Sequence, residues 1–257
     1  MNTGDPSFYN LVLSGDCPPS VNMAMDEDIA LSVTEGNSPP TLRIYGWDRP
    51  ALTLGRFQTK LEGINTAFLM ERGIEAVRRP TGGRAILHGN DITYSFCSRY
   101  EGPFRGKGLR QCYEIISGAI IRALELSGIR ASMERAAHDA GRAGSPHCFQ
   151  SVSYAELTVN GKKIVGSAQR RWPGGFLQQG SIPVHIDEEL NGNVFENFAP
   201  EKMISLAAVS PGFDTERFIL NLKEGFQTAL GATLLPAVPP SGPPALQSLE
   251  KYRPLSF

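Results

Sequence analysis

Residues 145–171 bring together, within one short stretch, side chains that are suited to nucleophilic chemistry. Cys148 follows a Pro-His pair in a polar, turn-prone segment, and Lys163 comes fifteen residues later beside an Asn-Gly turn. The thiolate is the reactive form of cysteine, and a neighbouring cation lowers the pKa of the thiol. One hypothesis is therefore that Cys148 is a nucleophile and that Lys163 is its cationic partner.

Both residues also have an ordinary structural interpretation. Free cysteines are commonly small core residues without a chemical role, and this is how we interpret Cys97 and Cys112, which lie in apolar stretches. Lysines commonly flank an exposed Asn-Gly turn, which suits Lys162. Strand alternation puts Lys163 on the opposite face, where it can point into a cleft. The residues alone leave both interpretations of Cys148 open.

The second stretch of interest is "RRPTGGRAILHG", at residues 78–89. Gly82 and Gly83 permit positive φ and a close approach of a ligand to the backbone, and Arg78 and Arg79 place cations beside them. The stretch has the spacing of neither a P-loop nor a Rossmann fingerprint. It is interpreted either as a ligand-binding loop or as a plain turn between strands.

The periodicity of the apolar residues predicts the elements that must position these stretches. Strands are expected near residues 9–15, 41–47, 51–57 and 174–186, on both sides of the Gly-rich loop within 74–97, and in a hairpin over 155–171. Helices are expected over 22–33, capped by Ser20 or Asn22, over 111–128, and near 200–208 and 214–230. This pattern suggests an α+β (mixed α/β) fold with a central, largely antiparallel sheet flanked by helices.

Composition limits the class of protein. The chain has 257 residues, a formal net charge of −1, 41% hydrophobic and 20% charged residues, which is typical of a globular protein with a substantial core. The near-neutral charge argues against bulk nucleic-acid binding. The sequence contains no run of about eighteen apolar residues, so no membrane span is predicted. Four scattered cysteines indicate reduced thiols rather than a disulfide framework or a zinc site, so we expect a cytoplasmic protein.

Several stretches together resemble the biotin/lipoate A/B protein ligase family. They are "NMAMDEDI" (22–29), "LRIYGWDRPALTLGRFQ" (42–58), "RRPTGGRAILHGNDITYS" (78–95), "NGKKIVGSAQRR" (160–171), "LQQGSIPV" (177–184) and "LEKY" (249–252). The resemblance implies a sheet-centred fold like the catalytic domain of biotin protein ligases and class II synthetases. It also implies one catalytic domain over 1–257, with a family core at about 38–235. The sequence itself indicates a Pro-rich linker at 236–244 and a C-terminal segment at 245–257 that can dock back.

The family contains several reactions. Its ligases activate lipoate with ATP and Mg and generally lack a cysteine at the position of Cys148, whereas its octanoyltransferases and amidotransferases form a cysteine thioester. A cysteine ahead of the Gly-Lys-Lys turn resembles the octanoyl-[acyl-carrier-protein]:protein N-octanoyltransferase branch, which needs no cofactor. ATP-dependent lipoate ligation, lipoyl-domain amidotransfer and a non-catalytic acyl- or carrier-binding role remain as alternatives.

The resemblance also implies roles for particular residues. Cys148 would take the octanoyl group from acyl carrier protein, and a lysine of a lipoyl domain or glycine-cleavage H protein would receive it. Lys163 would stabilise the thiolate, and the backbone at Gly82 and Gly83 could supply oxyanion donors. The remaining substrate-binding candidates are Arg78, Arg79, His88, Gly166, Ser167 and Ala168, of which the last three would form the wall of an acyl slot. A basic rim that steers acidic carriers is expected from Arg78, Arg79, Arg84, Lys162, Arg170 and Arg171.

Overall fold

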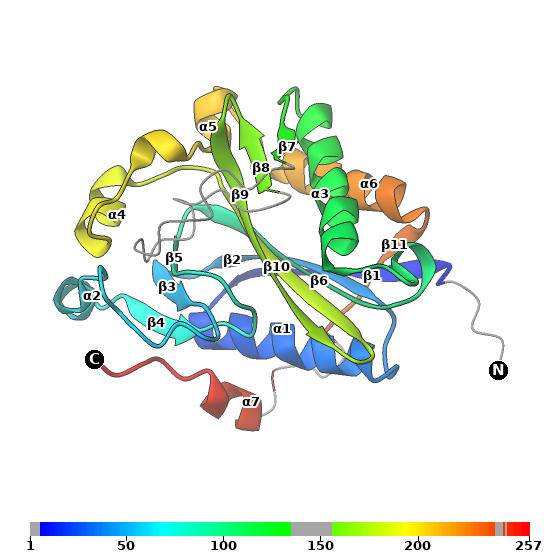
Figure 1. The fold of residues 1–257 in the computed structure, drawn as a ribbon, viewed down its shortest axis with the longest axis horizontal. Helices are drawn as coiled ribbons and strands as arrows, with labels where there is room; N and C mark the ends of the chain where they lie inside the picture. Colours follow the sequence, from blue (N-terminus) through cyan, green and yellow to red (C-terminus); the bar gives the residue numbers. More distant parts are fainter. Residues whose placement is uncertain (1–5, 135–155, 240–243, 245) are drawn as a thin grey trace.

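The computed structural model describes residues 6–134, 156–239, 244 and 246–257, and a large twisted sheet runs through its centre (Figure 1). In spatial order its strands are β11 (Thr233–Pro236), β1 (Phe8–Cys17), β2 (Thr41–Trp47), β6 (Asp91–Arg99), β10 (Gly175–Pro183), β9 (Lys162–Trp172), β8 (Glu156–Val159) and β7 (Ser132–Glu134). Strand β1 is parallel to both β11 and β2. The five neighbouring pairs in the spatial order β2-β6-β10-β9-β8-β7 are all antiparallel, which confirms the largely antiparallel sheet.

Helices cover both faces of this sheet. On one face α1 (Pro19–Thr34) packs on β6 and β10, and its Ile29 shares a core with Cys97 and Leu177. On the other face, α3 (Leu109–Leu126) and α6 (Thr215–Leu230) lie against each other (Figure 1). They share a core with Phe96 on β6 and Phe176 on β10. Successive residues of β6 and β10 therefore enter opposite cores, as strand alternation requires.

A small second sheet lies beside the first. Its order is β4 (Glu75–Arg78), β3 (Ala51–Leu54) and β5 (Ile86–His88). With α2 (Thr66–Arg72) and α4 (Glu188–Val194) it encloses a separate core around Leu52, Leu69 and Phe195. The remaining elements are η1 (Gly102–Phe104), η3 (Pro200–Lys202), α5 (Leu206–Val209) and α7 (Leu246–Lys251).

The long predicted elements are present, but the helix expected near 200–208 is two short turns, η3 and α5, and the short strands β7 and β11 were not predicted. Helix α1 begins at Pro19 without a side-chain cap, because proline suits the first helical turn and the Asn22 amide instead bonds to Cys17 O and Gly46 O. The stretch 74–97 forms three strands rather than two, and α2 and α4 were not predicted. The hairpin is confirmed, since Asn160 and Gly161 have φ values of 52° and 74°, as a type I′ turn requires.

The C-terminal segment docks on α1, as the sequence suggested. Ser248 Oγ donates to Asp28 at 2.6 Å, and Lys251 pairs with Glu27. Tyr252 is buried against Met23, in the small core that also contains Tyr45 and Trp47. Within the described ranges, no helix combines the length and the apolar character that crossing a membrane would need.

Candidate active site

A narrow, mainly apolar pocket lies where the small sheet meets β9 and β10. It encloses about 330 Å³ of empty space, including its open mouth. The structure brings five of the predicted substrate-binding residues together in its lining: Arg79, His88, Gly166, Ser167 and Ala168. The apolar part of the lining, which sequence analysis missed, comes from Met23 on α1, Trp47 on β2 and Ile86 on β5.

Small residues form the side of this pocket that β9 and β10 supply. A Cβ added to Gly180 would lie 2.3 Å from the ring of Tyr94, so glycine alone fits there. The Tyr94 hydroxyl lies 2.9 Å from Ser167 Oγ, which fixes the Ser167 side chain. Ala168 lies next to the Gly-rich loop: a Cβ built on Gly83 would be 3.7 Å from the Cβ of Ala168. The wall at Gly166, Ser167 and Ala168 thus consists of small residues, while the space beside Gly180 is occupied by the Tyr94 ring.

Arg79 holds the Gly-rich loop in shape. Its guanidinium donates to Gly82 O at 2.6 Å, to Arg84 O at 2.7 Å and to Thr53 O at 3.2 Å, and the side chain is almost fully buried. Gly83 has a φ of 87°, in the left-handed region that favours glycine. The loop is therefore a preformed structure beside the pocket, and much of the Arg79 donor capacity is directed at the backbone.

Arg78, Gly82 and Gly83 lie outside the pocket lining. Arg78 Nη1 donates to Gly55 O at 3.0 Å and to Gln58 O at 2.7 Å, so it fixes the neighbouring loop. That loop packs closely on the Gly-rich loop, since a Cβ at Gly55 would lie 1.8 Å from Gly83 O. Arg78 therefore supports the pocket indirectly, by holding the loop that packs against the Gly-rich loop.

The structure describes only one of the two predicted catalytic residues, Lys163. Cys148 lies outside the described residues, so its distance to Lys163 stays untested. Lys163 has no solvent exposure, and its Nζ lies 2.5 Å from Glu156 Oε1, a carboxylate that sequence analysis did not single out. Lys162 is half-buried, which agrees with the expected alternation of the two side chains.

The other cysteines fit the structural interpretation. Cys97 and Cys112 are both buried in apolar cores. Burial raises the pKa of both thiols, well above the ordinary value for Cys97. Neither is therefore a reactive thiol.

His88 is held rigidly at the edge of the pocket. Its Nδ1 lies 2.9 Å from Asp91 Oδ2, its Nε2 lies 2.9 Å from Thr53 Oγ1, and its ring stacks on Trp47 with centroids 4.1 Å apart. Burial alone would raise the pKa of Asp91, but His88 and the donors Ser181 Oγ and Gly89 N bring that pKa below its usual value. Asp91 is thus an ionised carboxylate that orients the imidazole ring.

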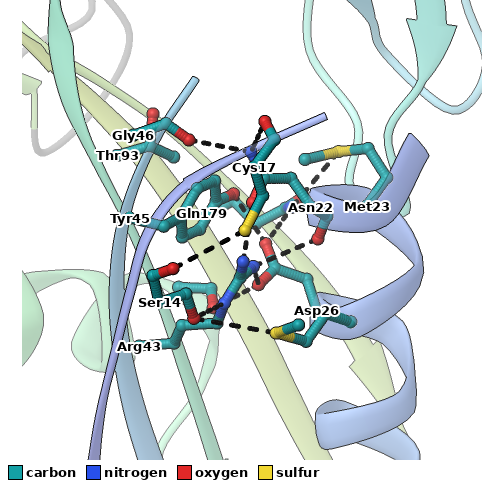
Figure 2. Close-up of polar contacts among 12 residues, drawn as sticks. Ser14, Cys17, Asn22, Met23, Asp26, Arg43, Tyr45, Gly46, Thr93 and Gln179 are labelled. Carbon is teal, nitrogen blue, oxygen red and sulfur yellow. Dashed lines mark hydrogen bonds and ion pairs between the residues drawn. The ribbon is translucent and has the colours of Figure 1, made fainter. Parts of the chain in front are cut away.

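A buried polar network beneath the pocket was not predicted (Figure 2). Asp26 Oδ1 accepts from Arg43 Nη1 and Ser95 Oγ, both at 2.7 Å, while Oδ2 accepts from Tyr45 OH at 2.8 Å and Gln179 Nε2 at 2.7 Å. The side chains of both Asp26 and Arg43 have no solvent exposure, so each charge depends on the other. The signal available in the sequence was an arginine in the middle of the apolar strand "TLRIYGW".

This network extends to the Gly-rich loop. Gln179 Oε1 accepts from Thr81 Oγ1 at 2.7 Å, so Gln179 connects α1 to the loop through two hydrogen bonds. Burial, followed by the charge of Asp26, raises the pKa of Tyr45 well above its ordinary value, which keeps its hydroxyl a donor. The network therefore fixes the relative positions of three walls of the pocket.

Four of the six expected rim cations bond to neighbouring groups of the protein. Arg78 and Arg79 bond to loop carbonyls, and Arg170 lies 2.6 Å from Glu27 and over the Trp172 ring. Arg171 is exposed and donates to Tyr100 OH. Across the described part of the chain, no group of three or more His, Cys, Asp or Glu side chains is arranged to hold a metal ion.

Comparison with known proteins identifies relatives over most of the chain. Residues 18–227 match the lipoyl protein ligase A/B catalytic domain. A protein of Kyrpidia tusciae named octanoyltransferase LipM is 36% identical over 89% of each chain. Another protein with that name, from Geobacillus kaustophilus, is 39% identical over 73% of this chain and 69% of its own.

Solved structures share the fold. Lipoate-protein ligase A bound with ATP superposes with a TM-score of 0.75 at 21% identity, over 94% of this chain and 90% of its own. The putative lipoate protein ligase Ta0514 of T. acidophilum, with bound lipoic acid, gives a TM-score of 0.73 at 20% identity over the same shares. At this identity the likeness concerns the architecture.

Proposed function

The chain belongs to the lipoyl protein ligase A/B catalytic domain family, and from this premise we propose that it is an octanoyltransferase of lipoate biosynthesis. The observation that carries the proposal is the narrow apolar pocket walled by Gly166, Ser167 and Ala168. Each buried CH₂ group contributes about 0.8 kcal/mol, so a slot of this kind can bind an octanoyl tail by several kcal/mol.

The acyl donor in this proposal is octanoyl-acyl carrier protein. The Cys148 thiolate attacks the thioester carbonyl, the new C–S bond forms to Cys148, and the carrier leaves as its thiolate. Lys163 supplies the positive charge near the sulfur, and backbone N–H groups of the Gly-rich loop supply the oxyanion donors. What supports these roles is the buried positive charge of Lys163, which is paired with Glu156, and the rigid Gly82–Gly83 loop beside the pocket.

The acceptor is a lysine of a lipoyl domain or of glycine-cleavage H protein. Its ε-amine attacks the octanoyl thioester, the C–N bond forms, the C–S bond breaks, and the Cys148 sulfur takes up the proton that the amine loses. Because one pocket serves two carriers in turn, a covalent intermediate is well suited to the task. Neither ATP nor a metal takes part in this sequence.

The test is intact-mass spectrometry after incubation with octanoyl-acyl carrier protein. The wild-type protein is expected to gain one octanoyl group, and Cys148→Ala is expected to gain none. Cys17→Ser is the matched control, because Cys17 is half-buried and the variant should load normally. An adduct that persists in Cys148→Ala would contradict the assignment of the nucleophile.

A further inference from the structure

A second and larger cavity adjoins the acyl pocket. It contains about 890 Å³ of empty space, including the part open to solvent, and lies between β5, the end of β10 and the start of α4. His88 and Ser181, both almost fully buried, line both cavities, so the two spaces adjoin at these side chains. The acyl pocket therefore has a neighbouring compartment that the octanoyl tail does not need.

The lining of this second cavity has a distinct chemistry. Its walls are apolar at Leu87, Pro183 and Ile186, and the exposed Asp187 supplies a carboxylate, whereas the Asp91 carboxylate is buried and already paired with His88. Among the described residues that line it, none is a lysine or an arginine. Such a lining favours a cation on an aliphatic stem, since the stem contacts the apolar wall and the charge meets the Asp187 carboxylate. It disfavours a phosphate group for the same electrostatic reason.

We propose that the second cavity receives the acceptor lysine, while the first pocket holds the octanoyl chain. This inference rests on the proposed function and names the site of its second step. A lysine side chain is a cation on a four-carbon stem, which matches the lining. The two cavities adjoin at His88 and Ser181, so an amine held in one lies near the carbonyl end of a chain held in the other.

Two substitutions separate this cavity from the acyl pocket. Asp187→Asn removes a carboxylate but keeps the start of α4 intact, because the Asp187 side chain accepts from Leu190 N at 2.8 Å and asparagine caps a helix equally well. Ile186→Phe enlarges a half-buried wall residue that lines only the second cavity. Glu188→Gln is the matched control, since it also removes a negative charge from the start of α4 but lies outside the lining.

The experiment measures the two half-reactions separately. Loading is followed with octanoyl-acyl carrier protein alone, and transfer is followed by mixing isolated octanoyl-enzyme with an apo lipoyl domain in a single turnover. Ile186→Phe is expected to slow transfer about tenfold or more, because a misplaced amine loses its attack geometry. Asp187→Asn is expected to slow transfer by about three- to tenfold through the lost charge. Loading should stay within about twofold of wild type in both, as should both steps in Glu188→Gln.

The outcomes are distinct. Slower loading with normal transfer would overturn the proposal. It would indicate that the second cavity binds the acyl carrier protein donor and not the acceptor lysine. Unchanged transfer, or an equal fall in both half-reactions, would also overturn it. If the proposed octanoyltransferase function itself is wrong, the wild-type protein would form no octanoyl-enzyme, which is a different result from any of these.

Discussion

Single residues in this protein act through their partners. Lys163 is an ammonium group without solvent exposure, and Glu156 lies 2.5 Å from it with a side chain that is 10% exposed. Burying a charge is costly unless it is paired, so the two residues must be considered together. The same holds for Asp26 with Arg43 and for Asp91 with His88.

The Lys163–Glu156 pair gives a stability prediction. Glu156→Gln leaves the buried ammonium without this carboxylate, and loss of one partner of a buried pair costs about 3–5 kcal/mol of unfolding free energy. The double variant Glu156→Gln/Lys163→Met is expected to regain a large part of that loss, because no charge remains to be buried. Denaturant unfolding of the four proteins in the cycle measures this. Simple additivity of the two single effects would contradict it.

The Asp91–His88 pair gives a pH prediction. The folded-state pKa of Asp91 lies below its ordinary value, so its stabilising contribution is present above about pH 3.9 and is lost as the pH falls through the folded-state pKa. Asp91→Asn should therefore be less stable than wild type at pH 7, and the two unfolding free energies should converge below pH 4. Unfolding curves between pH 3 and pH 7 test this, and a constant difference across that range would refute it.

Sequence reasoning at this scale found residues that depend on local pattern. Arg79, His88 and the Gly166–Ala168 wall lie in one pocket as expected. It missed Glu156, Asp26 and Gln179, because their partners are set by strand register and helix packing. Asp26, for instance, meets Arg43 across seventeen residues and Gln179 across 153 residues of chain.

At the scale of elements, Glu27 joins three segments. It accepts from Arg170 on β9 at 2.6 Å and from Lys251 on α7. Burial opposes its charge, but Lys251, Tyr252 and Arg170 lower the pKa of Glu27 below the usual value. The C-terminal segment thereby becomes part of the support for the pocket, since Tyr252 packs with Met23 and Trp47.

The docked segment predicts a coupled loss of stability and loading. Tyr252 is 4% exposed, and removing a buried aromatic side chain costs about 3–5 kcal/mol. Tyr252→Ala should lower the unfolding midpoint and slow octanoyl loading, because the pocket residues that it contacts lose a neighbour. The exposed Arg253→Ala is the control. Normal loading in a clearly destabilised Tyr252→Ala would show that the segment does not support the pocket.

The side chain at position 168 on β9 is expected to determine the length of acyl chain that the pocket accepts. Ala168→Leu adds a half-buried side chain that projects toward the Gly-rich loop and shortens the slot. Octanoyl loading is expected to fall about tenfold, since two or more CH₂ groups would lose their contacts, while a butanoyl donor should be affected much less. Ala232→Leu, a half-buried position next to β11, is the matched control. An equal effect on both donors would argue against this wall.

At the scale of the whole molecule, the site arises where two sheets meet. The large sheet supplies the small residues of β9 and β10, the small sheet supplies Thr53, Ile86 and His88, and α1 supplies Met23. The sequence predicts the long, periodic elements and the antiparallel sheet well. It does not predict the short elements α2 and α4 or the pairing of β3 with β4, because segments of four to seven residues carry little periodic signal.

The most direct test of the central claim is a complete transfer without ATP. The purified protein is mixed with octanoyl-acyl carrier protein and an apo lipoyl domain, and the mass of the lipoyl domain is followed over time. We expect one octanoyl group to appear on its lysine, and the product to be absent with Cys148→Ala. Modification that requires free octanoate or lipoate together with ATP, and that is absent with the acyl carrier donor, would contradict the account.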